Sequence, residues 1–121
     1  MHSSLKGKFI EATTQFQQSP HSEGCASVIY RTPWVRILIE PHKEDDTYCI
    51  EVEVFLSNQD GVDESDSMVL FDRLVRHVDY LRCLREHGFE LCIIGSGCIL
   101  CATKVIEGTP QDNLFSALLP P

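Results

Sequence analysis

The chain has 121 residues, of which 43% are hydrophobic and 23% are charged. These proportions are typical of folded globular proteins, and the length suits one domain that buries a core without metals or disulfides. The 10 basic and 18 acidic residues leave a formal net charge of −8. This charge argues against nucleic acid and anionic membrane surfaces as partners, because phosphate binding requires a basic face.

Six cysteines occur in a chain whose first residues contain no apolar signal core. We therefore expect a cytoplasmic protein with free thiols, because reducing compartments keep cysteines unpaired. The longest apolar run covers residues 91–100, well short of the roughly 20 residues that a membrane-spanning helix needs. No membrane association is expected.

Residues 1–24 carry the weakest pattern of the chain. Residues 8–16 suit either a helix or a strand, and the whole stretch also fits a mobile terminus. The sequence from residue 17 to residue 24, QQSPHSEG, is typical of a loop. A short strand is expected next, over residues 25–30.

Two segments of alternating apolar residues, 34–40 and 47–56, predict an antiparallel hairpin that is joined by a polar turn at residues 41–46. In each segment every second side chain is apolar, which places those side chains on one face of a sheet. The shared apolar face consists of Val35, Ile37, Ile39, Tyr48, Ile50, Val52, Val54 and Leu56.

The register of this hairpin follows from side-chain parity. We expect Glu40 to lie opposite Thr47, because a slip by one residue would place isoleucines opposite glutamates. This register also pairs Arg36 with Glu51 on the other face, where a cross-strand charge pair contributes roughly 0.2–1 kcal/mol.

The strongest pattern predicts one long helix over about residues 65–87. Gly88 suits the left-handed position that follows a helix, and the basic Arg82 and Arg85 complement the helix dipole near its end. The predicted apolar face contains Leu70, Leu74, Val78 and Leu81, with Phe71, Val75 and Leu84 beside it.

A second hairpin is predicted from residues 89–94 and 98–106, which are joined across a tight glycine-rich turn. A short helix should follow within residues 109–121, with Thr109 as its N-cap and Pro110 at its first position. The sequence thus predicts a single α+β domain over residues 1–121. Its fold is a two-layer sandwich, in which an antiparallel sheet of four to five strands packs on the long helix, with a β-hairpin before and after that helix.

The second hairpin contains a C-x-x-C pattern formed by Cys98 and Cys101. With Cys92 and His87 they make a candidate Cys₃His metal site or a redox dithiol. A regular strand would separate Cys98 and Cys101 onto opposite sheet faces, so the favoured interpretation is free thiols that pack as small apolar side chains. No cofactor is expected.

The same hairpin allows a cross-strand thiol pair. A two-residue turn would place Cys92 opposite Cys101, within reach of a disulfide, whereas a three-residue turn would place Cys92 opposite Leu100.

The C-terminal segment is a candidate partner-binding helix. It is too short to be stable alone, so it must dock either on its own sheet or on another protein. The second sheet face is also half apolar, because Trp34, Leu38 and Phe55 lie there, and this favours a homodimer or a protein partner. The candidate partner-binding residues are Leu114, Phe115, Leu118 and Leu119.

Three functions are compatible with these patterns. The first is a non-enzymatic protein-interaction or self-association module. The second is a thiol-based metal-binding or redox protein that uses the hairpin with Cys92, Cys98 and Cys101. The third is a regulatory domain with a small-molecule pocket between helix and sheet. The sequence contains no phosphate loop, dinucleotide fingerprint, nucleophile elbow or HExxH motif.

Overall fold

The computed structural model describes residues 4–18, 26–55, 67–94 and 99–121, with residues 67–70 described by their backbone alone. Helices in these ranges are α1 (Leu5–Gln18), α2 (Ser67–Glu86) and α3 (Asp112–Leu118). Strands are β1 (Ser27–Arg31), β2 (Val35–Pro41), β3 (Thr47–Phe55), β4 (Glu90–Ile94) and β5 (Ile99–Glu107).

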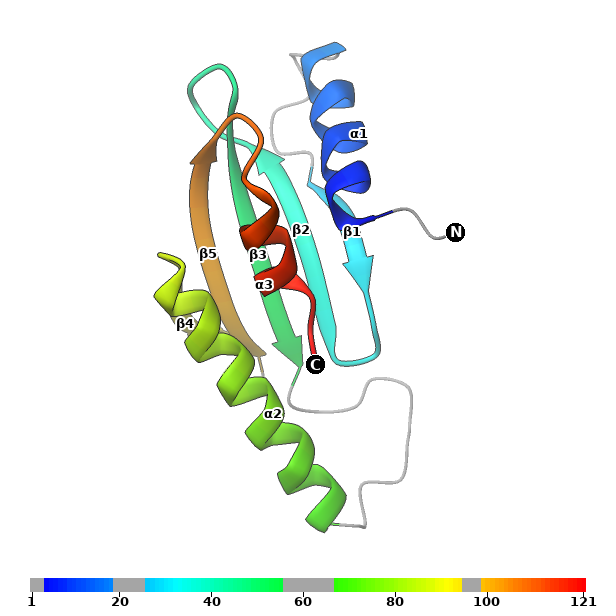
Figure 1. Ribbon diagram of the computed structural model, residues 1–121, viewed down its shortest axis with the longest axis vertical. Helices are drawn as coiled ribbons and strands as arrows, with labels where there is room; N and C mark the ends of the chain where they lie inside the picture. Colours follow the sequence, from blue (N-terminus) through cyan, green and yellow to red (C-terminus); the bar gives the residue numbers. More distant parts are fainter. Residues whose placement is uncertain (1–3, 19–25, 56–66, 95–98) are drawn as a thin grey trace.

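The strands form one antiparallel sheet with the order β1-β2-β3-β5-β4 (Figure 1). The predicted α+β fold, with a hairpin before and a hairpin after the long helix, is therefore confirmed. Strand β3 lies at the centre of the sheet, and β1 and β4 are its two edges. An edge strand leaves one row of backbone groups without a partner in the sheet.

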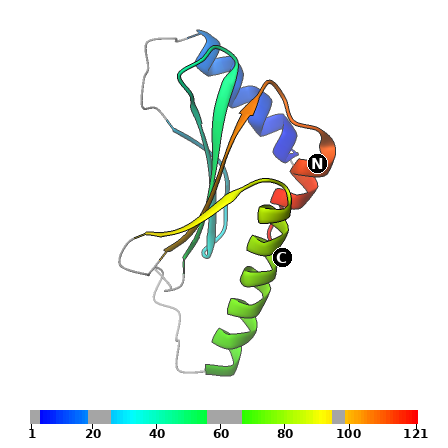
Figure 2. The same cartoon turned by 90° about the vertical axis from the view of Figure 1, so that its left-hand side faces the viewer.

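The three helices lie on the same side of the sheet, and none covers its other face within the described residues (Figure 2). The prediction of two layers holds, but the helical layer is shared by α1, α2 and α3 rather than formed by one long helix. Helix α2 extends beyond the end of the sheet in Figure 1, so only its C-terminal half can pack on the strands.

The core lies between the helices and the alternating side chains of the central strands. Phe9 of α1 is fully buried, and its ring forms edge-to-face pairs with Tyr48 and Phe115 at centroid separations of 6.0 and 5.6 Å. Edge-to-face ring pairs add about 0.5–1.5 kcal/mol each to the free energy gained by burial. The fully buried strand residues include Val35, Ile37, Ile39, Ile50, Val52 and Ala102.

The observed register of the first hairpin differs from the predicted one by two residues. Glu40 lies opposite Cys49 instead of Thr47, and Arg36 lies opposite Glu53 instead of Glu51. The parity was right and the turn length was wrong. Strand β2 continues through Pro41, and the His42 amide then donates to the Thr47 carbonyl at 3.0 Å, which shortens the turn.

The end of α2 matches the sequence prediction closely. Gly88 has a φ of 91°, and its amide donates to the Arg85 carbonyl at 3.0 Å. The Phe89 amide donates to the Leu84 carbonyl at 3.1 Å. These two bonds form a Schellman motif, in which a left-handed glycine lets the chain turn directly into β4.

The predicted apolar face of α2 is only partly correct. Leu81 and Leu84 are buried, and Tyr80 and His77 are buried with them on the same side of the helix, while Leu74 is exposed. The described side chains of α2 that are buried all lie in its C-terminal half, because its N-terminal half extends past the strands.

The two terminal helices also differ from the expectation. Helix α1 occupies a stretch in which helix and strand were left open. Helix α3 begins at Asp112 with Gln111 as its N-cap, not at Pro110 after Thr109. The Gly108 amide donates to the Asp46 carbonyl at 2.8 Å, so the chain stays tied to the turn between β2 and β3 before it enters α3.

Candidate functional site

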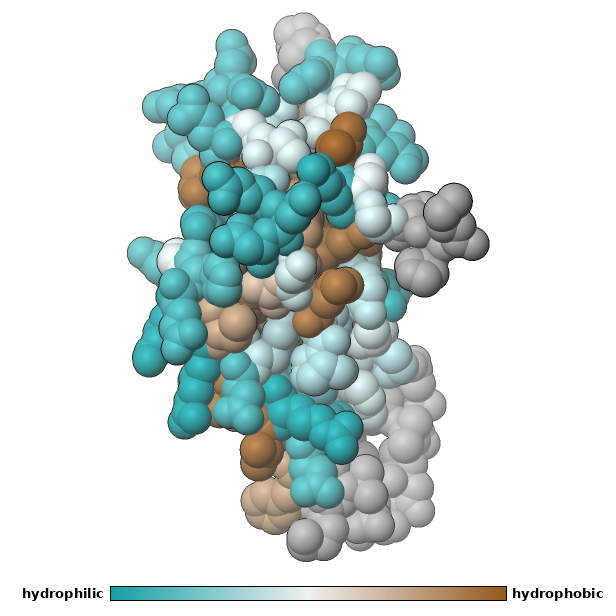
Figure 3. All heavy atoms as spheres, viewed as in Figure 1, coloured by the Kyte–Doolittle hydropathy of each residue, from teal (hydrophilic) through white to brown (hydrophobic). Residues whose placement is uncertain are grey.

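Helix α2 carries an apolar stripe that its own sheet does not cover. Phe71 and Val75 are 61% and 58% exposed, Leu74 is also exposed, and Val78 is half-buried. Their spacing of i, i+3, i+4 and i+7 places them on one side of the helix. Figure 3 shows brown and tan spheres among the teal ones over α2. We call Phe71, Leu74, Val75 and Val78 the α2 stripe.

Contacts on the opposite side of α2 fix the orientation of this stripe. The Arg73 guanidinium stacks 3.3 Å from the centroid of the Trp34 ring, next to the turn between β1 and β2. The Tyr80 hydroxyl donates to the Leu118 carbonyl at 2.6 Å. His77 is buried, and its Nδ1 donates to the Arg73 carbonyl at 2.7 Å. Because these contacts hold one side of the helix, the stripe faces away from the core.

Charged residues of both signs lie along one side of the α2 stripe. Asp72, Arg76, Asp79 and Arg82 are exposed, and Arg82 lies 3.6 Å from Asp79. An exposed ion pair of this kind contributes only about 0–1 kcal/mol to stability. The two aspartates and two arginines sum to zero charge. This part of the surface therefore lacks the excess negative charge of the whole chain, whose net charge is −8.

Edge strand β4 is exposed along its whole length. Leu91 pairs with Ala102 and Ile93 pairs with Leu100, so both belong to the sheet face that carries the helices. Ile93 is nevertheless 67% exposed. Apolar side chains on an open edge strand are unusual for an isolated protein, because such edges invite pairing with another chain.

The sheet face that no described helix covers, called the bare face below, contains a row of polar and thiol side chains on neighbouring strands. Across neighbouring strands, Arg36 lies opposite Glu53, Glu53 opposite Cys101, and Cys101 opposite Cys92. Arg36 Nη2 donates to Glu53 Oε1 at 2.6 Å, and the Glu53 side chain is buried. A buried carboxylate needs such a partner, because desolvating an unpaired charge costs several kcal/mol.

Cys101 and Cys92 differ in their surroundings. Cys101 is buried and its Sγ donates to Glu51 Oε1 at 3.3 Å, whereas Cys92 is exposed. Burial, then the hydrogen bond to Glu51 and its negative charge, raise the pKa of the Cys101 thiol above its ordinary value of 9.0. Cys101 is therefore held mainly in its protonated form, which reacts more slowly than a thiolate. Cys92 lies opposite Cys101, which is the pairing predicted for a two-residue turn, and the turn itself lies outside the described residues.

His87 belongs to a different cluster. Its Nδ1 lies 2.9 Å from the Cys83 carbonyl and 4.0 Å from Cys83 Sγ. A carbonyl only accepts, so Nδ1 carries the proton and cannot act as a base toward the Cys83 thiol. Lys104 Nζ donates to the His87 carbonyl and so provides a hydrogen-bond partner for a backbone group at the C-terminal end of α2.

The four candidate metal ligands are thus divided in the structure. Cys92 and Cys101 lie side by side, His87 stays with Cys83, and Cys98 lies outside the described residues. In the parts of the chain that the structure describes, no three histidine, cysteine or acidic side chains gather in a way that could hold a metal ion.

Helix α3 packs against its own chain. Leu114, Phe115 and Leu118 are buried, and α3 contacts α1 and α2, while Leu119 beyond it is 51% exposed. Three of the four candidate partner-binding residues are therefore already part of the chain's own core. The sequence left open whether this helix docks on its own chain or on another protein, because the pattern of a short amphipathic helix does not reveal which surface it contacts.

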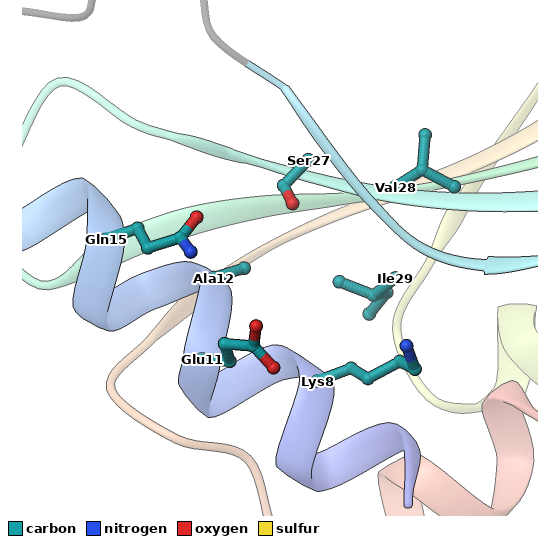
Figure 4. Close-up of a pocket in the computed structure, with 7 residues that line it drawn as sticks. All are labelled: Lys8, Glu11, Ala12, Gln15, Ser27, Val28 and Ile29. Atoms are coloured by element: carbon teal, nitrogen blue, oxygen red, sulfur yellow. The ribbon is translucent and has the colours of Figure 1, made fainter. Parts of the chain in front are cut away.

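A small hollow lies between α1 and β1 and has a volume of about 80 Å³ (Figure 4). Lys8, Glu11 and Gln15 of α1 point toward it, and Ser27 and Ile29 of β1 form its other side. Typical small-molecule sites measure about 300–1,000 Å³ and are mostly apolar. This polar hollow is too small for a metabolite-sized ligand.

Comparison of the chain with known family models, curated proteins and solved structures produced no match. Among the helices in the described ranges, none combines the length and the hydrophobicity needed to cross a membrane.

Proposed function

We propose that this protein is a non-enzymatic self-association module that forms a homodimer through the α2 stripe. The observation that carries the proposal is the exposure of Phe71 and Val75 on a helix whose opposite side is anchored in the core. A contiguous apolar surface of this kind costs free energy in water and is typical of an interaction site.

A second copy fits this surface better than an unrelated partner because the neighbouring charges complement themselves. In a two-fold contact the same patch meets itself in reverse order. An antiparallel crossing centred near residue 77 would bring Asp72 close to Arg82 of the other copy. It would also bring Asp79 close to Arg76 of that copy. Both charge pairs would lie along one side of the contact, next to the apolar stripes.

The rest of the surface supports this location. With a net charge of −8, two copies repel each other over most approaches. The α2 stripe lies beside balanced charges, so apolar burial there is not opposed by that repulsion. The exposed Leu91 and Ile93 lie on the same side of the sheet as α2 and offer additional apolar area.

Sedimentation velocity over a wide range of protein concentrations tests the proposal. Val75→Glu should raise the dimer dissociation constant by on the order of 100-fold or more, because a buried unpaired carboxylate costs several kcal/mol. Val105→Glu is the matched control, since Val105 is 51% exposed on the bare sheet face. Circular dichroism verifies that both variants fold.

Two results would contradict the proposal. One is a wild-type chain that stays monomeric at all concentrations. The other is a dimer that Val75→Glu and Val105→Glu weaken to the same extent, which would indicate that the contact lies elsewhere.

A further inference from the structure

We propose that Cys92 and Cys101 are a redox modification site. At this site a low-molecular-weight disulfide such as glutathione disulfide converts two free thiols into a cross-strand disulfide within one chain. The inference is independent of the proposed dimer, because the thiol pair lies on the bare face of the sheet and the α2 stripe lies on the helical side.

Position in the sheet is the first support. Cys92 and Cys101 are direct cross-strand partners on β4 and β5, so their side chains project from the same face. The β-carbons of such partners are about 4.5–5.5 Å apart, and a disulfide needs about 3.5–4.5 Å. The gap is closed by a movement of about 1 Å. Strand β4 can make this movement because its outer edge has no strand beside it in the described structure.

The other described cysteines have no comparable partner. Cys49 of β3 lies opposite Glu40 and Val105, and Cys83 lies near His87 on α2. Within the described residues, Cys92 and Cys101 are the cysteines that face each other across neighbouring strands. Their direct pairing distinguishes them from cysteines that serve only as separate small side chains in a core.

The different exposure of the two sulfurs sets the order of steps. Exposed Cys92, as the thiolate, attacks one sulfur of the reagent R–S–S–R, forming Cys92–S–S–R and releasing R–S⁻. Buried Cys101 then loses its proton and attacks the Cys92 sulfur, which forms the protein disulfide and displaces the second R–S⁻. The two protein thiols lose two electrons and two protons, and the reagent becomes two R–SH molecules.

Glu51 controls the second step. Its carboxylate accepts the hydrogen bond from Cys101 Sγ and keeps the proton on the thiol, so Cys101 attacks slowly. Glu51→Gln removes the negative charge and should increase the rate at which the Cys92 mixed disulfide closes. Glu51 is a positioning residue here, because it acts only through Cys101.

The experiment exposes the reduced full-length protein to glutathione disulfide, blocks remaining thiols with N-ethylmaleimide, and measures the denatured mass. Cys92, Cys98 and Cys101 are not separated by any lysine or arginine, so trypsin leaves them in one peptide. Cleavage after Leu100 by chymotrypsin separates Cys101, and the Cys98→Ser variant removes the remaining ambiguity.

The expected product lacks two hydrogen atoms and links Cys101 to Cys92, and it forms in the Cys98→Ser and Cys83→Ser variants. It should be absent in Cys92→Ser, while Cys101→Ser should stop at a glutathione adduct on Cys92. Faster closure in Glu51→Gln supports the assigned order of steps. Linkage of Cys92 to Cys98, or a glutathione adduct that never closes in the wild-type chain, would overturn the proposal.

Discussion

The two hairpins of the sheet start from similar patterns and end in opposite environments. The hairpin of β2 and β3 lies at the centre of the sheet, and its inward side chains are almost completely buried. The hairpin of β4 and β5 places β4 at the edge, where every residue is exposed. An apolar strand residue therefore contributes to stability only if its neighbours in the fold cover it, and otherwise it becomes available for contacts with other molecules.

The largest expected effect contrasts two isoleucines in these hairpins. Ile50→Ala in β3 should lower the free energy of unfolding by about 2–5 kcal/mol, because Ile50 is fully buried and the change leaves a cavity. Ile93→Ala in β4 should change it by about 0.5 kcal/mol or less in the monomer. Urea unfolding of both variants measures the difference. Equal losses would mean that β4 is covered.

An intermediate effect contrasts two arginines in carboxylate pairs. Arg36→Ala should destabilise the protein by about 2–3 kcal/mol, because it leaves the buried Glu53 carboxylate without its partner. Arg82→Ala removes the exposed pair with Asp79 and should cost about 0.5 kcal/mol or less. Both can be measured by thermal unfolding at low protein concentration. A large effect of Arg82→Ala that grows with concentration would implicate the dimer instead.

The smallest effect is a gradual loss of stability at alkaline pH. Burial raises the pKa of both Cys101 and Tyr80 above their ordinary values in the folded state. The unfolded chain therefore releases these protons first. Their contribution is complete below the unfolded thiol value of 9.0 and is lost as the pH rises above it.

Urea unfolding from about pH 8 to pH 11 tests this sign. Cys101→Ser and Tyr80→Phe should each reduce the slope, because each removes one titrating group. Stability that increases with pH in this range would be incompatible with the burial of these two groups.

The accuracy of the sequence prediction depended on whether a signal was local. Gly88 was placed correctly because its left-handed conformation follows from the end of the helix next to it. The first hairpin was shifted by two residues because the sequence does not reveal that Pro41 stays in the strand. The Arg36 pairing with Glu53 was missed for the same reason.

Among the candidate sites, the thiol pair was partly predictable. A two-residue turn was one of two possible geometries, and that alternative alone places Cys92 opposite Cys101. The exposed α2 stripe was not foreseen, because its residues have the same spacing as residues that face a core. Only the length of the sheet beneath α2 separates the two cases.

The sequence by itself determined the fold class, the side-chain parity of the strands and the end of α2. These follow from periodicity and backbone preference, which act over a few residues. Tertiary structure alone decided which apolar side chains are covered, where α1 and α3 dock, and which polar groups surround Cys101. Burial depends on residues that are distant in the chain, so no local pattern contains it.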